Sequence, residues 1–95
     1  MPEMRFAIRW PDGTKESCYS PSLVIKDFFS PGKAYPLDDF VVRSRDALNI
    51  ASERVKAKFG FACSSAMDQL SRIETAAKAF AHLPDACVRV DAFEE

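Results

Sequence analysis

Apolar and polar residues alternate over the first ten positions of the chain. Met4, Phe6, Ile8 and Trp10 are separated by single residues, and this period of two is typical of a half-buried strand. A Pro-Asp-Gly sequence follows directly, which suits a three-residue loop closing in a glycine bulge. The pattern predicts a β-hairpin whose return strand covers residues 14–20.

The length of this loop also predicts the register of the hairpin. If Trp10 pairs with Thr14, Phe6 lies opposite Cys18, and the neighbouring residues pair accordingly. Side chains alternate between the two faces of a strand, so Cys18 is expected on the core side. Arg5, Arg9 and Tyr19 are expected on the opposite face, which would contact water or a partner.

Two later stretches have apolar residues spaced by three and four, as amphipathic helices require. The first covers residues 36–59 and should end at Gly60, because glycine takes the left-handed position after a helix at little cost. The second begins at Ser64 or Ser65 and should end before Pro84. The short connection between them predicts an antiparallel helical hairpin.

Alternation returns over residues 87–93 and predicts a third strand. Counting chain reversals makes this strand parallel to the first, so we expect a mixed three-stranded sheet in the order 2-1-3. The helical hairpin should cover one face of the sheet. The prediction is therefore a single two-layer α+β domain over residues 1–95, with the element order β-β-α-α-β.

The connection over residues 20–36 is long for a compact domain and rich in apolar residues, so a functional role is expected. We predict a short helical turn here, with a short extra strand as the alternative, and a turn at residues 30–32. So many large apolar side chains should not all fit a small core, and we expect the exposed ones to dock on a partner protein. The predicted binding residues are Tyr19, Leu23, Lys26, Asp27, Phe28 and Phe29, with Phe28 or Phe29 as the anchor.

Composition and charge narrow the classes of function. The 95 residues are 47% hydrophobic and 28% charged, which is average for a globular chain. Thirteen Lys and Arg against fourteen Asp and Glu give a net charge of -1, so no overall positive field favours binding to nucleic acid. The N-terminus has no apolar signal region and no stretch is long enough to span a membrane, so we expect a cytoplasmic protein.

The side chains that usually carry chemistry are few and scattered. Cys18, Cys63, Cys87 and His82 do not have the spacing of a disulfide framework or a zinc site, so we expect no metal and no cofactor. Cys18 is the candidate nucleophile, and it would need a neighbouring cation, histidine or helix N-terminus to lower its pKa. The alternative is that Cys18 packs in the core opposite Phe6.

Four stretches of the sequence, residues 1–6, 9–13, 18–27 and 52–55, carry a resemblance to a known family. The most specific is the Cys-Tyr-Ser-Pro-Ser-Leu run at residues 18–23, which neither turn chemistry nor periodicity demands. The chain resembles a small bacterial family of nitrogen-starvation-response proteins, encoded beside a nitrilase, a radical-SAM protein, an acetyltransferase and a flavin oxidoreductase. The resemblance implies an accessory protein of nitrogen or nitrile metabolism and carries over no catalytic residue.

Three functions follow from these observations. The first is an accessory protein that binds another protein of the same pathway and is not an enzyme. The second is a small thiol-dependent enzyme or redox protein that uses Cys18. The third is a nucleic-acid-binding regulator, because the helix start at residues 36–48 is similar to that of small antitoxins built on a reduced RNase H-like fold, although two successive helices argue against it.

Overall fold

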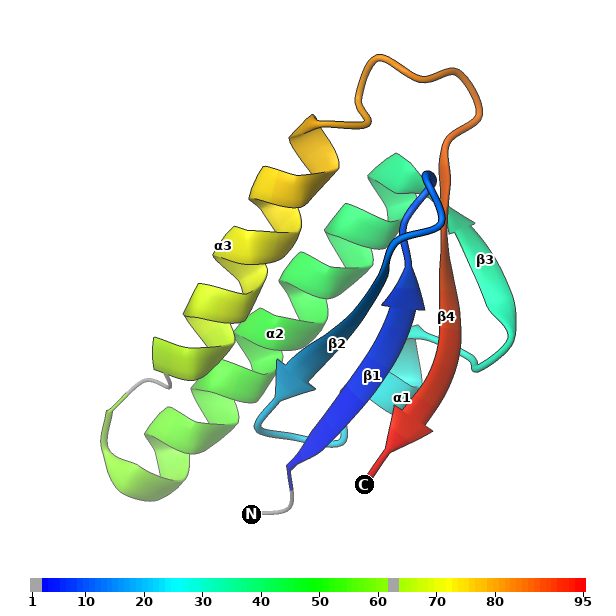
Figure 1. Ribbon diagram of the computed structural model, residues 1–95. Helices are drawn as coiled ribbons and strands as arrows, with labels where there is room; N and C mark the ends of the chain where they lie inside the picture. Colours follow the sequence, from blue (N-terminus) through cyan, green and yellow to red (C-terminus); the bar gives the residue numbers. More distant parts are fainter. Residues whose placement is uncertain (1–2, 62–63) are drawn as a thin grey trace.

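The computed structural model describes residues 3–61 and 64–95, and it is an α+β structure of two layers (Figure 1). Helices α2 and α3 lie side by side on one face of a four-stranded sheet. In chain order, the elements in these residues are β1 (Met4–Arg9), β2 (Lys15–Ser20), α1 (Ile25–Phe28), β3 (Lys33–Pro36), α2 (Leu37–Phe59), α3 (Ser64–Lys78) and β4 (Cys87–Glu94).

The β1–β2 hairpin has the predicted loop and register. The backbone N–H of Trp10 donates to the carbonyl of Thr14 at 2.8 Å, and Gly13 at φ 90° donates to the carbonyl of Trp10 at 2.8 Å. Phe6 lies opposite Cys18, as the loop length required. Local turn chemistry was therefore sufficient to place every residue of this hairpin.

The topology of the sheet differs from the prediction. The strand order is β2-β1-β4-β3, and β4 runs antiparallel to β1, so the expected three-stranded mixed sheet in the order 2-1-3 is wrong. The cause is β3, which pairs antiparallel with β4 at the edge and adds one chain reversal before α2. This reversal inverts the direction of every later element. The strand expected at residues 87–93 is confirmed, and so is its place beside β1.

The two long helices form where the apolar spacing predicted them. Helix α2 ends at Gly60, which is left-handed at φ 84° and donates its N–H to the carbonyl of Lys56 at 2.8 Å. Helix α3 ends at Lys78, and the chain continues toward Pro84 as a series of turns rather than as α-helix. In the part of the chain that the structure describes, no helix combines the length and apolar character needed to cross a bilayer.

The core lies between the inner face of the sheet and α2. Phe6 and Ile8 of β1 are fully buried, as are Phe40 and Leu48 of α2. The Trp10 ring meets Phe40 edge-on, with centroids 5.8 Å apart, an arrangement that aromatic pairs favour. Strand β1 lies between β2 and β4, so it supplies the central row of this core.

Leu48→Ala should lower the free energy of unfolding by about 2–5 kcal/mol, because the removed methyl groups leave a cavity in a fully buried site. Ile50→Ala, two residues along the same helix, is the control: Ile50 is 38% exposed, so its loss should cost less than about 1 kcal/mol. Chemical denaturation of both variants measures the difference. Equal losses would show that this face of α2 is assigned incorrectly.

Candidate functional site

The connection between β2 and β3 contains the predicted short helix, but its apolar residues turn inward. Val24, Ile25 and Phe29 are at most 3% exposed. The Phe29 ring contacts both Phe6 of β1 and Phe40 of α2, with centroids 6.1 Å and 5.3 Å apart. Phe29 therefore belongs to the core and cannot anchor a partner at the surface.

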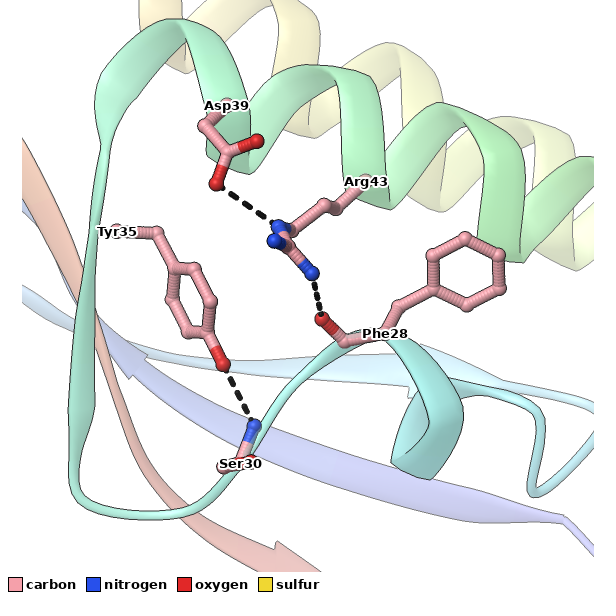
Figure 2. Close-up of polar contacts among 5 residues, drawn as sticks. All are labelled: Phe28, Ser30, Tyr35, Asp39 and Arg43. Atoms are coloured by element: carbon pink, nitrogen blue, oxygen red, sulfur yellow. Dashed lines mark hydrogen bonds and ion pairs between the residues drawn. The ribbon is translucent and has the colours of Figure 1, made fainter.

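The guanidinium of Arg43 ties the second half of this connection to α2 (Figure 2). Arg43 donates through Nη1 to the carbonyl of Phe28 at 2.8 Å and through Nε to Oδ2 of Asp39 at 2.8 Å. It also lies 5.1 Å from the centroid of the Tyr35 ring, whose hydroxyl accepts the N–H of Ser30 at 2.7 Å. The end of α1, the turn after it and the start of β3 are thus held against one helix.

Two serines of the family-specific run build the turn that leaves β2. Ser20 Oγ donates to the carbonyl of Ser22 at 2.7 Å, and Ser22 Oγ accepts the N–H of Val24 at 3.3 Å. Arg54 of α2 donates to the same Ser22 oxygen at 3.0 Å. Both serines are buried, so this part of the run is explained by folding.

The outer surface of α1 holds the other residues predicted to bind. Lys26 and Asp27 are exposed, and Leu23 and Phe28 on either side of them are half-buried. Lys26 Nζ forms an ion pair with Oε2 of Glu95 at 2.7 Å. We call Leu23, Lys26, Asp27 and Phe28 together the α1 rim. Contact of the α1 rim with a partner protein stays a prediction.

Tyr19 lies at a different surface, between the edge strand β2 and helix α3. An open hollow of about 830 Å³ occurs there, and a second of about 550 Å³ continues it along the strand. Ser17, Ser71 and Arg72 line both hollows, so they form one continuous channel. We call this channel the β2–α3 groove; other side chains that line it include Arg5, Glu16, Tyr19, Asp68, Gln69 and Thr75.

Gln69 fixes the position of β2 against α3. Its Oε1 accepts the backbone N–H of Tyr19 at 2.9 Å, and the side chain is only 6% exposed. The Tyr19 hydroxyl donates to Oε2 of Glu3 at 2.9 Å, and the Arg5 guanidinium lies 5.9 Å from the centroid of the Tyr19 ring. Sequence reasoning missed Gln69, because a glutamine beside an apolar stripe gives no sign that it is buried.

Arginines of the groove differ from Arg43 and Arg45 in their partners. Arg43 and Arg45 each form an ion pair with a carboxylate of a helix, at 2.8 Å and 2.9 Å. In residues 3–61 and 64–95, neither Arg5 nor Arg72 has a carboxylate within ion-pair distance. Asp68 lines the same groove one helical turn before Arg72 without forming such a pair. The groove therefore presents two cations that remain available to an anionic group.

Cys18 lies on the inner face of β2 and is fully buried. Its Sγ donates to Oε2 of Glu16 at 3.9 Å. Burial, and then the charge of Glu16, raise the pKa of the Cys18 thiol far above its ordinary value. The thiol stays protonated at neutral pH, which is opposite to what a nucleophile requires.

The other candidate ligands are dispersed. Cys87 and His82 are exposed, and Cys63 lies outside the described residues. Within the described ranges, no three His, Cys, Asp or Glu side chains are grouped so that they could hold a metal ion.

Thiol labelling tests the placement of the two described cysteines. In a Cys63→Ser background, Ellman's reagent at pH 8 should modify Cys87 quickly and Cys18 only after unfolding, because Cys18 is buried and protonated. Denaturant should then release the second thiol. Two rapidly reacting thiols in the folded protein would contradict the buried position of Cys18.

Similarity to known proteins is found at the level of a family. No curated protein and no solved structure matches the chain. Residues 5–93 match the family described as nitrogen starvation-induced protein NitG. This match covers nearly the whole chain and at least most of every element of the fold, and it confirms the resemblance to a nitrogen-starvation-response family. The chain therefore belongs to the nitrogen starvation-induced protein NitG family.

Proposed function

We propose that this chain is a cytoplasmic accessory protein of the nitrogen starvation response that binds another protein of the same pathway and is not itself an enzyme. The role in nitrogen starvation follows from the family. The observation that carries protein binding is the β2–α3 groove, an open channel beside an edge strand, whose larger hollow is mainly polar and holds two arginines without a carboxylate partner among the described residues.

The chemistry of the groove suits a protein surface better than a small substrate. Sites for small molecules are concave, mostly apolar, and bury most of the ligand. The larger hollow of the groove is open and is lined by charged, hydroxyl and amide side chains. Arginine and tyrosine are enriched among the residues that dominate protein interfaces, and the groove carries Arg5, Arg72 and Tyr19.

A smaller hollow extends this surface toward the α1 rim. It has a volume of about 280 Å³, and Arg5, Tyr19 and Glu95 are among the residues that line it. Glu95 also pairs with Lys26 of the α1 rim. The start of β1, the end of β2, α1 and the end of β4 lie at the same end of the molecule (Figure 1). An interface centred on the groove would thus reach the sequence-predicted residues Leu23, Lys26, Asp27 and Phe28.

The two alternative functions receive less support from the geometry. A thiol enzyme needs an accessible thiolate, and Cys18 is buried with a raised pKa. A nucleic-acid site needs a stripe of uncompensated cations along one face. On α2, Arg43 and Arg45 are instead paired with Asp39 and Glu74, and the groove that holds Arg5 and Arg72 is also lined by Glu16 and Asp68.

Affinity capture from nitrogen-starved cells, with a charge reversal in the groove, tests this proposal. A partner protein that co-purifies with the tagged wild type should be depleted about tenfold or more in Arg72→Glu, because an arginine facing the partner is replaced by a repelling charge. Lys78→Glu is the matched control, since it makes the same charge change at an exposed position of α3 outside the groove.

Retention of the partner by Lys78→Glu is required as well. If no protein co-purifies with the wild type under starvation, the proposed function is wrong. If Arg72→Glu captures as much partner as Lys78→Glu, the groove is not the binding surface.

A further inference from the structure

The main chain of β2 has one side that no strand of the described residues covers. The strand lies at the edge of the sheet, and among these residues it pairs with β1 alone. Because Trp10 and Thr14 form a hydrogen-bonded pair, strict alternation directs the main-chain groups of Glu16 and Cys18 toward β1. The N–H and carbonyl groups of Lys15 and Ser17 therefore point away from β1, and Ser17 lines the groove.

Gln69 shows how this edge is satisfied where α3 approaches it. Its Oε1 accepts the N–H of Tyr19, as the carbonyl of a neighbouring strand would do. Its buried Nε2 has no hydrogen-bond acceptor among the residues the structure describes. Toward the hairpin, Lys15 and Ser17 are exposed, and no described side chain replaces a strand there. Of the residues whose N–H points away from β1, Tyr19 is therefore bonded to Gln69, whereas Ser17, the next such residue toward the hairpin loop, is exposed.

The groove has the shape for an added strand. Ser17 lines both hollows, so the uncovered main chain lies where they meet. Helix α3 forms the opposite wall through Ser71, Arg72 and Thr75. Extended peptides bind to exposed sheet edges as an added strand, where main-chain hydrogen bonds provide affinity and pockets for alternate side chains provide specificity.

The charges of the walls indicate what such a peptide carries. Arg5 and Arg72 both line the larger hollow, and neither is paired with a described carboxylate. A guanidinium binds a carboxylate through two parallel hydrogen bonds, which makes an acidic side chain the matching group. Glu16 on the inner side is already engaged by the indole N–H of Trp10 at 3.1 Å.

We propose that the β2–α3 groove binds an extended segment of the partner protein, which adds to the sheet beside Lys15 and Ser17 and directs a carboxylate toward Arg5 and Arg72. This inference rests on the proposed function, because it specifies the segment that the partner presents. Gln69 ends the pairing at Tyr19, so the added strand is short.

The probe for this inference is a phage-displayed library of linear twelve-residue peptides, selected on the immobilised full chain. Ser17→Pro removes the outward N–H without breaking a bond to β1, and proline is tolerated at such edge positions. Ser17→Ala is the matched control, because it keeps the N–H. Selected peptides should carry an acidic residue, bind Ser17→Ala as they bind the wild type, and lose about tenfold in affinity for Ser17→Pro.

A second measurement does not depend on how Ser17→Pro folds. Methylation of the backbone nitrogens of a selected peptide, one residue at a time, should weaken binding only at alternate positions, because a strand turns every second N–H toward its neighbour. Exchange of its acidic residue for the amide should also weaken binding to the wild type but not to Arg72→Ala.

Three results would overturn the inference. One is a set of peptides that bind Ser17→Pro as tightly as the wild type or show no alternation on methylation. Another is a captured partner protein that Arg72→Glu fails to bind and Ser17→Pro still binds. This result would support the proposed function but exclude strand addition. The last is a dimer of the wild type that Ser17→Pro dissociates, which would assign the edge to a second copy of this chain.

Discussion

The contacts of Arg43 hold together the part of the chain on which the rest of the topology depends. Its guanidinium binds the last carbonyl of α1, stacks on Tyr35 of β3 and pairs with Asp39 of α2. These three elements make the chain reversal between β2 and α2. Since β3 passes directly into α2, its direction also determines that of both long helices and of β4. The antiparallel pairing of β4 with both of its neighbours follows from this reversal.

Local rules were sufficient for most of the elements. The hairpin was specified by its Pro-Asp-Gly loop, and α2 by its apolar spacing and Gly60. Strand β3 was not predicted at its position because it has four residues, of which only Tyr35 is buried. Val88, which pairs with Tyr35, is also distant in the sequence. Too few residues alternate here for a period to be recognised. The predicted direction of the last strand was wrong for this one reason.

The same connection explains why the expected apolar patch is small. A sheet of four strands has more inner surface to cover than a sheet of three, and Val24, Ile25 and Phe29 pack onto that surface beside α2. The core was therefore underestimated, and the exposed apolar area overestimated, by the omission of one strand. Tyr19 could be located from the hairpin register. Gln69 and Arg72 could not, because their importance arises from how α3 approaches β2.

The site that results is defined by the backbone more than by reactive side chains. Strand β2 is protected at Tyr19 by Gln69 and left open at Ser17, whereas many edge strands are blunted along their whole length by charge, proline or a bulge. A partial cover of this kind allows pairing with one short segment, and the flanking arginines give that segment a required charge. A protein that acts by such binding needs no activated cysteine, which agrees with the raised pKa of Cys18.

Amide hydrogen exchange of the free protein, followed residue by residue with NMR, tests this account most directly. Glu16 and Cys18 donate to β1 and Tyr19 donates to Gln69, so their amides should exchange slowly. The amides of Lys15 and Ser17 should exchange rapidly, since their N–H groups point away from β1. Protection of Ser17 equal to that of Cys18 in the monomer would show that the edge of β2 is already covered, and would contradict the central claim.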